Sequence, residues 1–402
     1  MGEGEQPSVH SSRIEPTIML TLPIQQQHAP PAALLPPLFA TWMSELLGGP
    51  IPAESTATCD DCAMCRTSDR MLTAHAKTFR PDVKCCSYMP HLPNFAVGGV
   101  LIDSSAEGVV GRATVQQRID AKIGVSPIGL DMSPPYGVLY ASSRHDAFGV
   151  SRALRCPHYV DEGGRCGIWR YRNSVCSTYH CKFVRGSVGR AFWIRLYQLL
   201  AEVESNLERW CVSELQLGEE VLRQLIKLDS WTHTDGPRLT AAALDGECDP
   251  AMYRRLWGDR WFGHERDFYI ASCRLAESLS WTDMEAIGGA KLGLYSRVTR
   301  DAYNQLMDWH VPDPLKCGDF SARVAQPGFV ALQAYSAQDQ LLVPQAFLTA
   351  LSLFDGERPT ARVIETLRDR GVTLSVAFVR RLVDFAVLVP STHVQDVDRV
   401  PS

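Results

Sequence analysis

Nine of the thirteen cysteines in this 402-residue chain lie in one segment, between Cys59 and Cys181. Thiolates bind soft metal ions in a tetrahedral arrangement, and two cysteines separated by two residues can direct both sulfur atoms at one ion. Longer gaps allow a loop or hairpin to bring in further ligands. The sequence therefore predicts a cysteine-ligated metal centre with nine candidate ligands: Cys59, Cys62, Cys65, Cys85, Cys86, Cys156, Cys166, Cys176 and Cys181.

Disulfide bonds are an alternative use of these cysteines, but the odd number of cysteines fits poorly with a fully paired set. The four remaining cysteines stand singly, and Cys211 and Cys273 fall on the apolar faces of predicted helices, where cysteine behaves as a small buried hydrophobe. Sulfur ligation suits both zinc and iron–sulfur clusters. We favour an iron–sulfur cluster, with zinc, or a set of thiols without metal, as alternatives.

The spacing of Cys59, Cys62 and Cys65 matches the beginning of the bacterial ferredoxin run. The fourth cysteine of that run would fall at Asp69, so the run is incomplete here. The Cys-x3-Cys-x2-Cys spacing of radical S-adenosylmethionine enzymes is absent. Five cysteines in the first group and four in the second could build one shared centre or two.

The second group resembles the YkgJ-type family of zinc- or iron-chelating cysteine-cluster proteins. Its four cysteines stand at the spacings of the family's Cys-Pro-x-Leu, Cys-x-Ile-Tyr, Arg-Pro-x-x-Cys-Arg and closing Cys: Cys156, Cys166, Cys176 and Cys181. Ile168-Trp169 stands where the family has Ile-Tyr, and Arg172-Asn173 where it has Arg-Pro. The first group matches three positions of the family's upstream Cys-x-x-Cys-x-x-Cys-Cys, and then Arg66 replaces the fourth.

This resemblance covers about a third of the chain and implies an iron–sulfur or zinc centre. Some relatives are linked to lysine N-methylation of flagellin, which implies a protein methylase as one alternative function. A methylase would need a site for S-adenosylmethionine. The nearest glycine-rich candidates, Gly98-Gly99 and Gly288 to Gly293, are predicted to be plain turns.

Several side chains beside the second group could act on the centre. His158 and His180 are expected to be hydrogen-bonding neighbours rather than ligands, although histidine can replace cysteine in iron–sulfur sites. His145-Asp146 is expected in a solvated turn. Basic side chains that could offset the negative charge of thiolates are Arg165, Arg170, Arg172 and Lys182.

The elements that position these residues are predicted to be mainly α-helical. An amphipathic helix is expected over Arg190–Leu228, with a second beginning near Gly218, and helices over Asp267–Leu279 and Thr282–Met307. Loops are expected over Trp231–Trp261, and irregular structure wrapping the centre over Pro90–Tyr140. The fold class is therefore mainly α, with an irregular cysteine-rich metal-binding domain.

The C-terminal segment predicts a small winged-helix-like unit. Apolar spacing indicates three short helices, the second beginning at Pro359-Thr360 and ending at Gly371, the third capped by Thr373 or Ser375. A strand is expected at Val387 to Pro390. The unit resembles small PqqD-like peptide-recognition domains, which implies a protein or peptide partner. Its net charge of about +1 does not predict nucleic-acid binding.

Composition sets the remaining expectations. The net charge is −5 and 45% of residues are hydrophobic, which is typical of a globular protein without a basic field for nucleic acid or anionic lipid. No run approaches the ~18 apolar residues of a membrane span. The acidic start predicts no secretory signal and a cytoplasmic location. We expect four segments: a low-complexity arm over residues 1–50, the cysteine-cluster domain over 51–189, a helical domain over 190–328 and the winged-helix-like unit over 329–392.

The function expected from these features is metal binding by the nine candidate cysteine ligands, with a role in electron transfer or as a redox accessory. A lysine N-methylase-like enzyme and a non-catalytic, zinc-stabilised interaction protein are the alternatives. Whether the chain is an enzyme is left open by its residues, and no catalytic residue is assigned.

Overall fold

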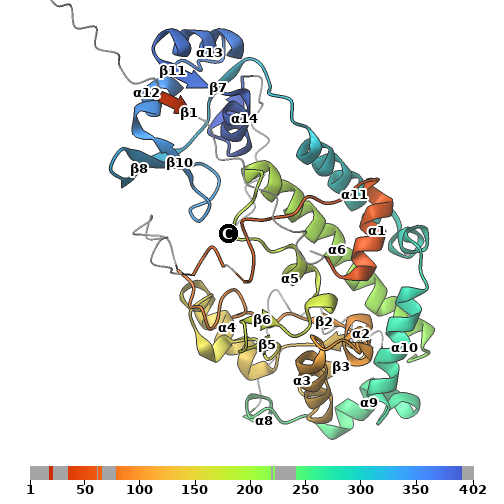
Figure 1. The fold of residues 1–402 in the computed structure, drawn as a ribbon. Coiled ribbons are helices and arrows are strands. Elements are labelled where there is room, and N and C mark those ends of the chain that lie inside the picture. The colour runs from red at the N-terminus through yellow and green to blue at the C-terminus, as the bar shows by residue number, and fades with distance from the viewer. Residues whose placement is uncertain are drawn as a thin grey trace, which may run out of the picture. The chain divides into compact units, whose positions relative to one another are not determined.

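The computed structural model describes residues 18–20, 35–60, 62–65, 78–218, 221 and 241–391. Its contacts divide the chain into two compact units, one of residues 27–308 and one of residues 1–26 with 309–402 (Figure 1). Helices make up about 52% of the structure, which confirms the mainly α class. No described helix is both long enough and apolar enough to cross a membrane.

The larger unit is built on a long helix, α6 (Gly186–Glu214), which lies against α11 (Trp281–Met307). An apolar stripe on α6, including Phe192, Leu196 and Val203, is buried in the core. The expected helical spacing is therefore confirmed, although α6 ends at Glu214 rather than continuing to residue 228. The helix predicted from Gly218 onward lies mostly outside the described residues.

Two further helices, α2 (Asn94–Ile102) and α10 (Glu265–Glu277), pack closely against each other. A Cβ atom on Gly98 would lie 1.9 Å from the backbone oxygen of Tyr269. The prediction of a turn at Gly98-Gly99 is thus wrong, because these glycines are helical and their lack of a side chain permits the contact. The other glycine-rich segment, Gly288 to Gly293, also lies within a helix, α11. Within it, Gly289 has a φ of 60° and kinks the helix.

The segment from Pro90 to Tyr140 is more regular than its glycine and proline content predicts. It contains β2 (Leu92–Pro93), α3 (Val109–Asp120), β3 (Val125–Ser126), β4 (Gly129–Leu130) and most of α4 (Pro134–Ala147), besides α2. The three strands form one sheet in the order β2-β4-β3. His145-Asp146, expected in a turn, lies in the last turn of α4.

The second half of the cysteine-rich segment has short elements that position its thiols. These are η2 (Arg152–Leu154), β5 (Tyr159–Val160), β6 (Arg165–Cys166), η3 (Trp169–Tyr171) and α5 (Ser174–Thr178). β5 pairs with β6 in an antiparallel hairpin. A Cβ atom on Gly111 of α3 would lie 2.1 Å from the Gly167 oxygen, so α3 packs directly against the loop after this hairpin.

Two other stretches differ from expectation. Helices α8 (Ala241–Leu244) and α9 (Pro250–Trp261) lie where loops were predicted, while residues 231–240 are outside the described part of the chain. The side chain of Asp249 accepts hydrogen bonds from the first turn of α9, and Pro250 follows it. This Asp-Pro pair is a helix-start signal that the many Gly and Trp residues obscured.

The low-complexity arm predicted over residues 1–50 ends earlier than expected. Helix α1 (Pro37–Leu47) buries Phe39, Trp42 and Met43 in the larger unit, and the Trp42 indole donates to the Leu279 oxygen. Strand β1 (Ile18–Leu20) pairs in parallel with β11 (Val372–Leu374). The remainder of residues 1–34 lies outside the description.

The smaller unit combines strands and short helices. Its elements are β7 (Leu315–Cys317), β8 (Ser321–Gln326), β9 (Phe329–Gln333), β10 (Leu341–Pro344), η5 (Gln345–Phe347), α12 (Leu348–Leu351), α13 (Thr360–Asp369), β11 (Val372–Leu374), α14 (Val376–Asp384) and β12 (Leu388–Pro390). Ser375 caps α14 and Gly371 has a φ of 79°, as predicted. The predicted strand forms as β12, which pairs with β7.

The close approach of α2 and α10 predicts a matched pair of glycine substitutions. Gly98→Ala forces a Cβ into backbone atoms, which is expected to lower the free energy of unfolding by about 1–3 kcal/mol or more. Gly293→Ala, in α11 with open space around it, is expected to raise it by about 0.5–1 kcal/mol. Urea unfolding followed by circular dichroism measures both. Equal effects of the two changes would contradict the packing of α2 on α10.

Candidate metal centre

The nine clustered cysteines come from three stretches of the larger unit, and all nine are half-buried. One stretch carries Cys59, Cys62 and Cys65. A second carries Cys85 and Cys86, directly after Lys84, whose φ of 53° turns the chain sharply. The third runs through the β5–β6 hairpin to Cys181, with Cys166 in β6 and Cys176 in α5.

Backbone and lysine contacts join these three stretches. The Cys156 amide donates to the Cys86 oxygen at 2.7 Å. The buried Lys84 ammonium donates to the Cys59 oxygen at 2.6 Å and to the Gly164 oxygen at 2.8 Å. The Lys84 ammonium thus links the first stretch to the β5–β6 hairpin of the third stretch. The backbone hydrogen bond between Cys156 and Cys86 links the third stretch to the second.

The thiols themselves gather around Cys85. A charge on Cys85 raises the pKa of seven other thiols of the set, which is possible only where the sulfur atoms are near one another: Cys59, Cys65, Cys86, Cys156, Cys166, Cys176 and Cys181. The eighth, Cys62, is linked to the set through Cys65 and Cys181. The structure therefore brings together residues that stand up to 122 positions apart, from Cys59 to Cys181.

The thiols form one connected set. Cys62 acts on both Cys65 and Cys181, and it also shares a hydrogen bond with Cys65. Cys166 acts on Cys156 and Cys176, and also on Cys59 and Cys86. Cys85 acts on thiols from all three stretches, so it connects the set.

Burial keeps most of these thiols protonated at neutral pH. Burial, with repulsion from Cys166, raises the pKa of Cys156 to about 12, and burial with the charges of Cys62 and Cys85 raises that of Cys181 to about 12. Cys85 is the exception. A hydrogen bond from the Cys86 thiol lowers the pKa of Cys85 to about 7, against the opposing effect of burial.

Cations stand among the thiols. The buried guanidinium of Arg172 donates to the Trp169 oxygen at 3.1 Å and to the Cys176 oxygen at 2.9 Å, and it lies over the Trp169 ring. Burial raises the pKa of Cys59 to about 11 and the charge of Arg172 opposes this rise, while the same charge contributes to the lowered pKa of Cys85. This agrees with the expected charge-offsetting role for Arg172, whereas Arg165 is an exposed partner of Asp60 at 2.9 Å.

Arg118, on α3, was not singled out from the sequence. Its side chain is 6% exposed, and one nitrogen donates to the Asp131 oxygen. Its Nε and Nη1 atoms have no hydrogen-bond partner among the described residues, and its charge partly opposes the rise in the pKa of Cys156 that burial causes. A buried guanidinium with two unpartnered donors beside a thiol is able to donate to a thiolate.

The two histidines differ in their surroundings. The ring of His158 is hydrogen-bonded through Nδ1 to Thr114 at 2.8 Å, which agrees with the expected neighbouring role. His180 packs its ring 4.4 Å from that of Trp193, and its buried Nε2 has no hydrogen-bond partner in the described residues. Burial lowers the pKa of both to about 3, so both rings are neutral.

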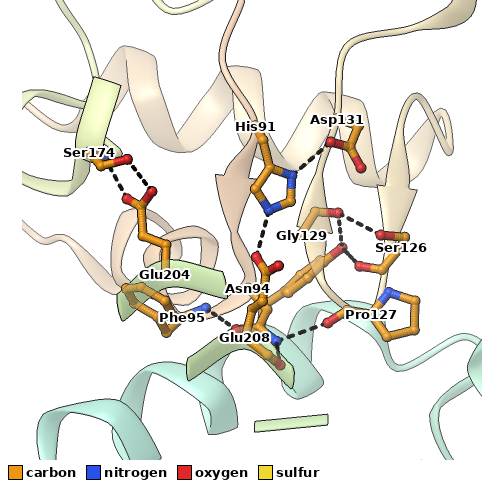
Figure 2. A network of polar contacts seen from close by, with 11 residues as sticks. His91, Asn94, Phe95, Ser126, Pro127, Gly129, Asp131, Ser174, Glu204 and Glu208 are labelled. Carbon is orange, nitrogen blue, oxygen red and sulfur yellow. Dashed lines mark hydrogen bonds and ion pairs between the residues drawn. The ribbon is translucent and has the colours of Figure 1, made fainter. Parts of the chain in front are cut away.

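Two buried carboxylates of α6, Glu204 and Glu208, form hydrogen bonds to neighbouring segments of the larger unit (Figure 2). Glu204 accepts from the Ser174 amide at 2.6 Å and from the Ser174 hydroxyl at 2.5 Å, which fixes the beginning of α5 and hence the position of Cys176. Asn173 caps the same helix by accepting from the Cys176 amide at 3.0 Å. Burial raises the pKa of Glu204 to about 8, because two hydrogen bonds only partly compensate for lost hydration.

A second contact joins α6 to the β2–β4–β3 sheet. His91 lies between two carboxylates, with Nδ1 2.7 Å from Asp131 and Nε2 2.8 Å from Glu208 (Figure 2). Burial opposes the charged ring, but the two carboxylates outweigh it and raise the pKa of His91 well above its usual value. Asn94 adds hydrogen bonds to the Pro127 and Glu208 oxygens.

Sequence reasoning missed both carboxylates, although a signal was present. Glu204 and Glu208 stand four residues apart on the otherwise apolar face of α6, next to Val203 and Leu207. Acidic residues on a buried stripe need partners. That pattern could have identified a buried polar contact, but the partners Ser174 and His91 are distant in sequence.

Among the described residues, no group of three or more His, Cys, Asp or Glu side chains has the arrangement of a formed metal site. The assignment of the nine cysteines as ligands therefore stays a prediction, supported by their gathering but not by a bonded geometry. No family model, no curated protein and no solved structure matches this chain. The resemblance to the YkgJ-type family likewise stays a prediction.

Glu204 predicts a pH-dependent stability. Its pKa is about 8 in the fold and about 4.5 when unfolded, so the folded state holds the proton more tightly. Between these values, rising pH ionises the unfolded chain first and destabilises the fold by about 1.4 kcal/mol per pH unit. We expect Glu204→Gln to remove this loss, so its stability relative to wild type rises from pH 5 to pH 8.

Urea unfolding at several pH values measures this difference. Glu214→Gln, at the exposed end of α6, is the matched control and should follow wild type at every pH. A constant offset between Glu204→Gln and wild type across this range would show that Glu204 does not hold a proton in the fold.

Proposed function

We propose that this chain is a cytoplasmic metal-binding protein whose centre is held by cysteine thiolates. We favour an iron–sulfur cluster as the occupant, with a role in electron transfer or as a redox accessory. The ligands are drawn from the nine clustered cysteines, among which Cys85 acts on seven others.

The observation that carries this proposal is the gathering of thiols around Cys85. Cysteines that serve only in packing are not expected to form a large group. Placing thiols close together makes each of them harder to ionise, and packing gains nothing from it. Cys211 and Cys273 are buried in α6 and α10 as expected from the sequence, and the charge of Cys273 acts on Cys211, so among the described residues these two thiols form a pair and not a larger group. A soft cation reverses the cost, because it binds deprotonated sulfur and stabilises several thiolates at once.

The surroundings fit a negatively charged centre. Arg172, Lys84 and Arg118 lie among the thiols, and Arg118 keeps two donors without protein partners. An iron–sulfur cluster with four thiolates is anionic, and hydrogen bonds to its sulfur atoms tune its reduction potential. The cluster would supply one-electron chemistry, while these cations would hold its charge inside the fold.

A zinc site is the second candidate, and one observation favours it around Cys62. Cys62 acts on both Cys65 and Cys181, and His180 adjoins Cys181 with a neutral ring and an Nε2 that has no hydrogen-bond partner among the described residues. Three thiolates and one imidazole are a donor set of structural zinc. In this arrangement zinc would stabilise the fold, and the protein would act by holding a partner.

A partner is proposed for the smaller unit. Its three-stranded sheet has the order β10-β9-β8, which leaves β8 at one edge. Four consecutive residues of β8 are exposed, with Val324 at 73%. An exposed edge strand can pair with an extended peptide, which supports a peptide partner rather than nucleic acid.

Metal analysis of anaerobically purified protein tests the centre. We expect iron together with acid-labile sulfide, and an absorbance band near 400 nm, because sulfur-to-iron charge transfer colours these clusters. A colourless protein containing only zinc would overturn the iron–sulfur proposal while keeping the thiolate site. Protein free of both metals, also after reconstitution with iron and sulfide, would overturn the site itself.

Single cysteine substitutions test which thiols are ligands. Cys166→Ser and Cys176→Ser are expected to remove most of the bound metal, because serine is a poor ligand for soft ions. Cys248→Ser and Cys317→Ser change exposed cysteines outside the set and serve as controls. Metal content per chain is measured by mass spectrometry, with circular dichroism to check folding. Equal retention of metal in all four variants would contradict the ligand assignment.

A further inference from the structure

A cavity of about 300 Å³ lies in the larger unit beside, but separate from, the cysteine cluster. It is enclosed by α1, α2, η3 and α10. Its volume falls at the lower end of the range seen for small-molecule sites. Such sites combine apolar walls with a few converging polar groups.

Aromatic side chains form most of the wall. Phe39 lies with its ring 6.4 Å from that of Trp42 and 6.4 Å from that of Phe95, and all three are buried. Their orientation is already fixed by packing, and by the hydrogen bond of the Trp42 indole to Leu279. The wall is therefore preorganised for an apolar group, in which aromatic contacts contribute beyond the area buried.

Two opposite charges line the same cavity. Arg170 and Glu277 are both exposed, and neither forms an ion pair with another described residue. Burial and the charge of Asp103 raise the pKa of the Tyr171 hydroxyl, Arg170 opposes this rise and Glu277 adds to it, so Arg170 and Glu277 both lie near Tyr171, which also lines the cavity. The Cys273 thiol shares a hydrogen bond with Glu277, and both of these side chains line the cavity.

We propose that this cavity binds a free α-amino acid with an apolar side chain, its carboxylate on Arg170, its ammonium on Glu277 and its side chain against Phe39, Trp42 and Phe95. This site does not depend on the metal centre. The nearby Arg172 is not the anion-binding group, because its guanidinium already donates to the Trp169 and Cys176 oxygens.

A zwitterion fits this arrangement better than a single charge. A simple carboxylic acid would pair with Arg170 but bring its negative charge close to Glu277. A simple amine would pair with Glu277 but bring its positive charge close to Arg170. A zwitterion satisfies both charges, and its own apolar group leaves water for the cavity.

Three matched probes test the proposal by ligand-observed NMR titration of the full chain: L-phenylalanine, 3-phenylpropanoate, which lacks the ammonium, and 2-phenylethylamine, which lacks the carboxylate. We expect L-phenylalanine to bind at least about five-fold more tightly than either single-charge probe, because each lost charged contact weakens binding. Absence of binding by L-phenylalanine at millimolar concentration, or equal affinity for all three, would overturn the proposal.

Two variants of exposed residues assign the charges. Glu277→Gln should weaken binding of L-phenylalanine by about three- to ten-fold but should not weaken binding of 3-phenylpropanoate, whereas Arg170→Gln should weaken binding of L-phenylalanine but not of 2-phenylethylamine. Arg274→Gln, exposed on α10 but outside the cavity lining, is the control. If Arg274→Gln weakens binding as much as the other two, the cavity is not the site. Metal content should be the same in all three variants, which separates this test from that of the centre.

Discussion

The cost of ionising several buried thiols that lie close together is the constraint on which the rest of this structure depends. Each sulfur near Cys85 becomes harder to ionise as another is added, and burial away from water increases that cost. The fold places few cations among these groups. Lys84 is the best positioned, because it also holds together the backbones of two cysteine-bearing stretches. The same side chain therefore sets both the local charge and the local geometry.

Helix α6 packs in the apolar core and also forms hydrogen bonds that fix the position of a cysteine-bearing segment. Its stripe of apolar residues packs against α11, while Glu204 and Glu208 on the same helix reach Ser174 and His91. Short elements such as α5 bury too little surface to be stable alone. Their positions are instead fixed by hydrogen bonds to a long helix that is stable through packing. A polar contact in the core thus determines where Cys176 lies.

The sequence allowed prediction of the elements whose signal is local. Helices α6, α10 and α11 followed from apolar periodicity, and the cap at Ser375 followed from residue type. Helix α2 was missed because Gly98 and Gly99 normally favour turns, and their helical role depends on Tyr269, which lies about 170 residues away. The grouping of the cysteines was expected from their clustering. The central place of Cys85 was not, because it depends on how three distant stretches fold together.

The different ionisation of the thiols bears on how a metal could enter. At neutral pH Cys85 is close to half ionised, since its pKa is about 7, whereas Cys156 and Cys181 hold their protons. An incoming cation would therefore meet one thiolate in the middle of the set rather than nine equivalent thiols. Once bound there, its charge would lower the pKa of the surrounding thiols and release their protons in turn. The hydrogen bond from Cys86, with smaller contributions from the charges of Arg172 and Lys84, lowers the pKa of Cys85, so these groups prepare the first ligand for a metal.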